Sequence, residues 1–188
     1  MTPWFLSRIA DRPLRRLPAT GLALLASLVL GLCASAPAVL AAEAAATAVQ
    51  TVAQLDAIGR AIAVARCQRP QEVKTRFLPS AQVADASDEM QSHACGGFRV
   101  AIYRFAGPGA PREVPMSVVV DSSHALLPAE WSTGARAAVI RSRLGEPQAA
   151  TTQSLTYWLN PRQPGRDRLT FEVEDGIVRA VSWSWVVD

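Results

Sequence analysis

Residues 168–187 read RLTFEVEDGIVRAVSWSWVV, two runs of alternating apolar residues on either side of Asp175-Gly176. Alternation with a period of two is typical of a β-strand with one buried face. An Asp-Gly pair is typical of a tight turn between two such strands. The stretch therefore predicts an antiparallel hairpin with strands over 168–174 and 177–187.

Two registers are open for this hairpin. A two-residue turn pairs Phe171 with Ala180 and puts the tryptophans of the second strand on the other face. A three-residue turn with a left-handed glycine pairs Val173 with Ile177 and gathers the large apolar side chains on one face. Because a slip of one residue exchanges the two faces of a strand, burial favours the second register. It places both tryptophans in the core and leaves Arg179 as the one misfit.

The chain before the hairpin alternates between helical and extended patterns. Apolar residues at three- and four-residue steps predict a helix over 47–66. Ser132 or Thr133 is placed to cap another helix over 134–144, which Gly145 and Pro147 end. Further predictions are a loose leader over 41–48, a short helix over 71–77, a loop over 80–95, and strands over 98–105, 114–121 and 153–159. This order predicts an α+β fold, an antiparallel sheet of about five strands with two or three helices packed on one face.

The first 42 residues have the pattern of a secretory signal peptide. Arginines precede an uncharged, leucine-rich run over 17–42 that ends in small residues, which is the order of a basic region, an apolar region and a cleavage site. We expect cleavage between about residues 36 and 43, and a single domain over 43–188 in the periplasm or outside the cell. The alternative is an uncleaved inner-membrane anchor over 19–42, a run just long enough to span a bilayer.

The charge of the mature chain argues against a nucleic-acid partner. The whole chain has a formal net charge of +3, but from Glu43 onward 15 Lys and Arg residues balance 15 Asp and Glu residues. Phosphate backbones are bound through a basic field, which a neutral chain lacks. We expect membrane contact only through the leader, if it is not cleaved.

Two cysteines follow the leader, Cys67 and Cys95. An oxidising compartment favours their pairing. We therefore expect a disulfide between them, which closes a loop of about 29 residues.

Residues 134–183 carry an ordered set of structural motifs. A helix ends in Leu-Gly-Glu-Pro at 144–147, a strand contains the pair Tyr157-Trp158, and a hairpin turns at Asp175-Gly176. This order resembles the helix-plus-β-hairpin module of the small outer-membrane assembly lipoproteins and of the β-lactamase-inhibitor-protein fold. The resemblance implies a helix-on-sheet module that binds other proteins, and it transfers no catalytic residue. The mature chain also divides into two weak helix-hairpin repeats, 47–121 and 132–188.

Few residues offer catalytic or metal-binding chemistry. Asp121, Ser122 and His124 are the residue types of a hydrolase triad, but neighbours at a strand end point in different directions. His93, the two cysteines and nearby acids form a metal-ligand set that competes with the disulfide. We assign no catalytic, cofactor-binding or metal-binding residue and expect no cofactor.

The loop over 160–168 is the best candidate for contact with a partner. Prolines restrict it, and it holds Arg162, Arg166 and Arg168, which suit an acidic partner. We expect a non-enzymatic protein of the bacterial envelope that binds another envelope protein through its sheet or this loop. Two alternatives stay open: a secreted hydrolase with carboxylates between helices and sheet, and a carrier of a small molecule or metal.

Overall fold

The computed structural model describes residues 36–80, 82–107 and 112–187. The chain divides into two compact units, residues 1–43 and 44–188. Of the first unit only the helical backbone of 36–43 is described, so most of the predicted signal peptide and of the alternative membrane anchor lies outside the described residues. The second unit holds the sheet and the disulfide.

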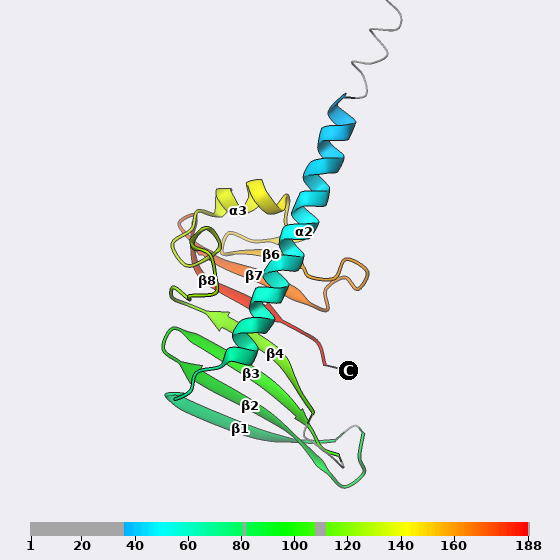
Figure 1. Ribbon diagram of the computed structural model, residues 1–188, viewed down its shortest axis with the longest axis vertical. Helices are drawn as coiled ribbons and strands as arrows, with labels where there is room; N and C mark the ends of the chain where they lie inside the picture. Colours follow the sequence, from blue (N-terminus) through cyan, green and yellow to red (C-terminus); the bar gives the residue numbers. More distant parts are fainter. Residues whose placement is uncertain (1–35, 81, 108–111, 188) are drawn as a thin grey trace, which may run out of the picture. The chain divides into compact units, whose positions relative to one another are not determined.

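An antiparallel sheet of eight strands forms the centre of the second unit (Figure 1). Its strands are β1 (Glu72–Pro79), β2 (Ser87–Cys95), β3 (Phe98–Phe105), β4 (Arg112–Val120), β5 (Ala149–Ala150), β6 (Ser154–Trp158), β7 (Arg168–Glu174) and β8 (Ile177–Ser184). They lie in the order β1-β2-β3-β4-β8-β7-β6-β5. The chain thus forms two successive groups of four strands, and the last strands of the two groups, β4 and β8, pair with each other.

A helix precedes each group of strands. Helix α2 (Ala36–Ala65) comes before β1, and helix α3 (Ala137–Leu144), with the short 3-10 turn η2 (Ala129–Trp131) ahead of it, comes before β5. The α+β class is confirmed, and so is the predicted helix over 47–66. The prediction of a loose leader over 41–48 is wrong, because its alanines, the best helix formers, continue α2 toward its start at Ala36.

The sheet is wider than predicted because β1, β2 and the two-residue β5 were not among the predicted strands. The predicted helix over 71–77 is wrong, since these residues belong to β1, and much of the predicted loop over 80–95 is strand β2. Nearly all residues of β1 are exposed, and most of β2 is half-buried. Strand β1 does alternate, with Val73, Thr75 and Phe77 on one face and Glu72, Lys74 and Arg76 on the other, but the run is too short and too exposed to distinguish a strand from a helix. Strand β2 has no period of two.

Both helices pack on the same face of the sheet. Trp183 of β8 is fully buried between its cross-strand neighbours Val118 and Leu169. Its indole N–H donates to the carbonyl of Leu55 in α2 at 2.9 Å. Cross-strand partners point to the same face of an antiparallel pair, so this face is continuous across β4, β8 and β7. The hydroxyl of Tyr157, on the same face of β6, donates to the carbonyl of Gly145 at the end of α3 at 3.1 Å.

Glycine at position 59 allows α2 to approach the sheet closely. A Cβ atom there would lie 2.6 Å from Cδ1 of Trp183, a distance that side chains do not tolerate. The flat indole therefore packs directly against the helix backbone. Trp185 extends this contact, because its indole N–H donates to Asp56 at 2.7 Å.

The terminal hairpin confirms the predicted burial of both tryptophans but corrects its register. Asp175 and Gly176 form a two-residue turn in which both have positive φ, 52° and 75°, and Val173 pairs with Val178 instead of Ile177. The extra residue lies at Arg179, the misfit of the predicted register, where the β7–β8 pairing shifts. A bulge at this exposed arginine restores the apolar side chains to one face.

Helix α3 begins later than predicted. It starts at Ala137, and its N-cap is Arg136 without a side-chain hydrogen bond. Ser132 instead donates to the carbonyl of Ala129. The predicted end is confirmed, because Gly145 has φ 76° and its N–H donates to Arg141.

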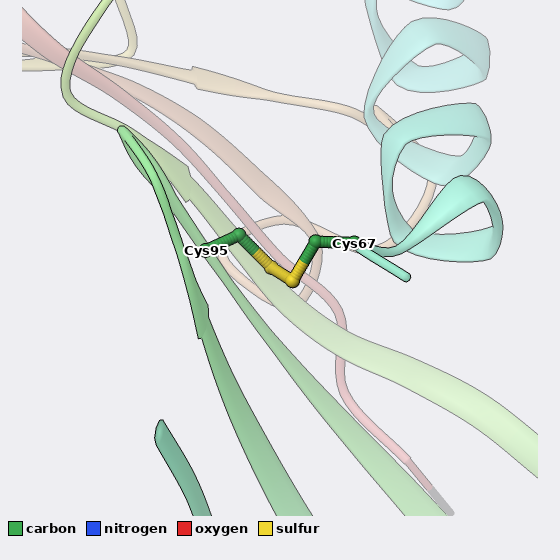
Figure 2. The surroundings of a disulfide bond; sticks show 2 residues. All are labelled: Cys67 and Cys95. Atoms are coloured by element: carbon green, nitrogen blue, oxygen red, sulfur yellow. A yellow bond between two sulfur atoms is a disulfide. The ribbon is translucent and has the colours of Figure 1, made fainter. Parts of the chain in front are cut away.

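The predicted disulfide joins Cys67, just after α2, to Cys95 at the end of β2 (Figure 2). Their Cα atoms are 5.8 Å apart, a normal separation for a disulfide. The bond ties the end of α2 to strand β2, two strands away from the β4–β8 pair that holds Trp183.

We predict that Gly59→Ala lowers the free energy of unfolding by about 1 kcal/mol or more, because overpacking against Trp183 outweighs the gain in helix propensity. Urea denaturation measures the effect. The matched control is Ala61→Gly at an exposed position of α2, which loses about 1 kcal/mol from propensity alone. A Gly59→Ala protein more stable than the natural one would contradict the close approach.

We predict that replacing Cys67 and Cys95 together by serine lowers the free energy of unfolding by about 3.5 kcal/mol, as expected for a closed loop of this length. Urea denaturation of the oxidised protein and of the double variant measures the difference. Equal stability of the two proteins would show that the bond does not constrain the unfolded chain.

Candidate functional site

The face of the sheet opposite the helices is left open by the fold. Within the described part of the chain, no helix lies on it. One cross-strand row of this uncovered face runs through Lys74, Ser92, Ala101, Ser117, Ser184, Arg168 and Trp158. The neighbouring row runs through Glu72, Ala94, Arg99, Val119, Ser182, Thr170, Thr156 and Ala149. None of these residues is buried.

Small polar residues form the floor in the middle of the uncovered face. Thr156 and Thr170 share a hydrogen bond of 3.1 Å between their hydroxyls, and Ser182 donates to the carbonyl of Thr170 at 3.5 Å. These contacts run along the sheet surface between β6, β7 and β8. The uncovered face is therefore accessible to the surface of a partner.

Larger side chains stand at the two sides of this floor. Trp158 and Arg168 are cross-strand partners at the β6–β7 side. Tyr103 and Phe105 lie at the far end of β3, with their rings 5.0 Å apart in an edge-to-face arrangement. The guanidinium of Arg112 lies 5.1 Å from the centre of the Phe105 ring. Aromatic and arginine side chains are the types that carry most of the binding energy in protein interfaces.

A buried carboxylate fixes the Tyr103 end of the uncovered face. Asp88 of β2 is only 1% exposed and accepts hydrogen bonds from the Tyr103 hydroxyl at 2.6 Å and from the N–H of Ala106 at 2.7 Å. The bond to Asp88, followed by burial, raises the pKa of Tyr103 above its usual value. The carboxylate thus holds the ring and the start of the β3–β4 connection in place.

A shallow hollow of about 290 Å³ opens on the uncovered face over β1 to β4. Lys74 and Arg99 are among its lining residues, with Ser92 and Ser117 on the floor. Lys74 pairs with Glu72 at 3.2 Å. Arg99 pairs with Asp121 at 4.0 Å, so both cations of the hollow stand beside a carboxylate.

The helix-covered side carries a chain of ion pairs and hydrogen bonds from α2 across the sheet. Arg66 pairs with Glu113 of β4, and Arg104 of β3 bridges Glu113 at 2.5 Å and Glu89 of β2 at 3.1 Å. The hydrogen bonds from Arg66 and then Arg104 hold the pKa of Glu113 below its usual value. Gln91 continues the chain by donating to Glu89. This network supports the fold and does not face the uncovered surface.

The three predicted partner-binding arginines lie in different surroundings. Arg168 is exposed on the uncovered face of β7, beside Trp158. Arg162 is exposed in the turn after β6, and its backbone N–H donates to Asn160 at 3.0 Å. Arg166 is half-buried. Only Arg168 therefore belongs to the uncovered face.

The residues considered as a hydrolase triad or as metal ligands take part in local hydrogen bonds or in the disulfide. Ser122 donates to the carbonyl of Gly97, and His124 accepts from the N–H of Leu126, so these two side chains are not joined as a nucleophile and base. Burial lowers the pKa of His124. Both cysteines are in the disulfide, and residues 36–80, 82–107 and 112–187 contain no group of three or more acidic, histidine or cysteine side chains placed to hold a metal ion.

Sequence reasoning missed Trp158, Tyr103, Phe105 and Arg99 as surface residues of one face. The polar half of that face was visible, since Thr170, Ser182 and Ser184 alternate with buried residues in the terminal hairpin. The aromatic residues were not assigned to it, because an aromatic residue in a strand usually indicates the core.

Comparisons with protein-family models, curated proteins and solved structures found no match. Among the described helices, none is long and apolar enough to cross a bilayer.

We predict that neither tyrosine of the folded protein ionises near pH 10. Burial raises the pKa of Tyr157 to about 12, and the bond to Asp88 raises that of Tyr103. A raised pKa means that the contribution of each protonated phenol to stability is present below pH 10, the usual tyrosine value, and is lost as the pH rises through the folded value. Tyrosinate absorbance at pH 10 tests this.

The urea-unfolded protein is the control and should show both tyrosines half-ionised at this pH. The Tyr103→Phe and Tyr157→Phe variants assign the two signals. Half-ionisation of either tyrosine in the folded protein at pH 10 would contradict its described surroundings.

Proposed function

We propose that this is a non-enzymatic protein of the bacterial envelope that binds another protein on the uncovered face of its sheet. The observation that carries the proposal is the contrast between the two faces. One face is filled by helices and the buried tryptophans, while the other presents small polar residues between Trp158 and Arg168 on one side and Lys74 and Arg99 on the other.

The size of the uncovered face supports a protein partner. Strand spacing gives a width of about 34 Å across the sheet, and about 20 Å along the strands gives roughly 600–700 Å². A stable protein interface buries about 800 Å² on each partner. A small molecule prefers an enclosed pocket, whereas the hollow over β1 to β4 is shallow.

Chemistry at the uncovered face supports recognition over catalysis. Its buried carboxylate, Asp88, is engaged by Tyr103 and by the backbone of Ala106, so it serves the scaffold and is not presented to a substrate. A hydrolase would instead need a pair of carboxylates facing a cleft with separated pKa values.

The disulfide supports an oxidising location. Pairs of this kind form and persist in secreted and periplasmic proteins and are rare in the cytosol. Together with the secretory pattern of the first 42 residues, this favours a partner in the envelope or outside the cell.

We predict that a photo-crosslinking amino acid placed at Ser182 or at Thr170 captures the same partner in the intact envelope, as one adduct of a discrete mass. The same amino acid at Ser142, an exposed position of α3, is the control and should give no such adduct. Adducts from Ser142 alone, or none from the uncovered face, would overturn the proposal.

Two arginines of the same loop region give a matched test of the site. Arg168 lies beside Trp158 on the uncovered face. Arg168→Ala should therefore reduce the yield of that adduct by about tenfold or more, as expected for a residue that carries binding energy. Arg162→Ala, outside this face, should leave the yield unchanged. Equal effects of the two substitutions would move the contact from the sheet to the loop.

A further inference from the structure

The two edges of the sheet are protected unequally. The edge strand β5 has two residues, Ala149–Ala150, so it offers little backbone for pairing. The opposite edge strand, β1, has eight residues, Glu72–Pro79, and pairs only with β2. In an antiparallel edge strand, alternate residues direct their N–H and C=O groups outward. Proteins normally shorten, cover or charge such an edge. Strand β5 is short, whereas β1 keeps its length and carries Glu72, Lys74 and Arg76.

The side chains of β1 differ between its two faces. On the helix side, Val73 and Phe77 are large and apolar, yet 49% and 68% exposed. On the uncovered side lie Glu72, Lys74 and Arg76, with a net charge of +1. Lys74 pairs with Glu72 at 3.2 Å, and within the described part of the chain Arg76 has no acidic partner. A strand added at this edge would cover the two apolar residues with one of its faces and meet positive charge with the other.

Charge makes a second copy of the chain a poor occupant. Two β1 strands that pair antiparallel with their faces preserved, and with Thr75 opposite Thr75, would place Lys74 of each copy opposite Arg76 of the other. A shift by two residues pairs Glu72 of each copy with Arg76 of the other, but it puts Lys74 opposite Lys74, shortens the ladder to residues 72–76 and leaves Phe77 outside it. Like charges directly opposite each other destabilise a strand pair.

We propose that β1 binds an extended segment of another protein by strand addition, and that the segment alternates apolar and acidic residues. Backbone hydrogen bonds along β1 supply affinity, and the side-chain pattern supplies selectivity. An acidic residue opposite Lys74 would have its carboxylate at the rim of the hollow that Lys74 and Arg99 line. This edge is a second interaction surface, separate from the centre of the uncovered face.

Synthetic peptides as long as β1 test the proposal on the full chain, with fluorescence anisotropy as the readout. A peptide of alternating Val and Glu should bind at least tenfold more tightly than one of alternating Val and Lys. N-methylation of alternate backbone nitrogens of the Val-Glu peptide should abolish its binding. The double variant Lys74→Glu/Arg76→Glu, at two exposed positions, should reverse the preference, and amides of β1 should gain protection from hydrogen exchange when the peptide is bound.

Three results would overturn the proposal: no binding of the Val-Glu peptide, equal binding of its N-methylated form, or a preference unchanged in the double variant. Concentration-dependent dimerisation that Lys74→Glu/Arg76→Glu abolishes would assign the edge to a second copy instead. Arg168→Ala, about 24 Å away across five strand spacings, should not change peptide binding. This control separates failure at the edge from failure of the function proposed for the uncovered face.

Discussion

The contact between Trp183 and the backbone of α2 at Gly59 is the constraint on which the fold depends. The indole lies fully buried on β8, one of the two strands that join the halves of the sheet, and bonds to the carbonyl of Leu55. Because glycine leaves room for the ring, the helix packs closely on the centre of the sheet. The buried tryptophans, Leu169, Val118, Val120 and Val181 therefore turn to that side, and the other face holds mainly small and polar residues.

The strands at the β1 edge of the sheet, beyond this contact, are held in place by a disulfide and by ion pairs. Strands β1 and β2 lie outside the apolar core, and the disulfide from Cys67 to Cys95 ties β2 to the end of α2. Arg66, Glu113 and Arg104 add a polar tie across β4 and β3. A covalent bond and ion pairs thus replace apolar burial where the sheet extends past the helix. This explains how a polar edge strand such as β1 stays ordered while almost fully exposed.

Sequence reasoning correctly predicted the elements whose buried apolar residues recur with a regular period. The helix before Cys67, strand β3, the terminal hairpin with its buried tryptophans and the stop at Gly145 all follow from apolar spacing or from glycine chemistry. It failed for β1, a short and exposed run whose alternation does not exclude a helix, and for β2, which has no period of two. It also placed the hairpin irregularity in the turn instead of at Arg179. Among the arginines chosen for binding, only Arg168 lies on the open face, because strand pairing across the sheet is not visible in a local pattern.

Thiol labelling of single cysteines in a Cys33→Ser background tests most directly that one face of the sheet is covered and the other open. We predict that Ser182→Cys reacts with a water-soluble maleimide in the folded protein. Val181→Cys, at the preceding position of the same strand but fully buried on the helix side, should react only after unfolding. Protection of position 182 together with rapid labelling of position 181 would contradict the assignment of the two faces.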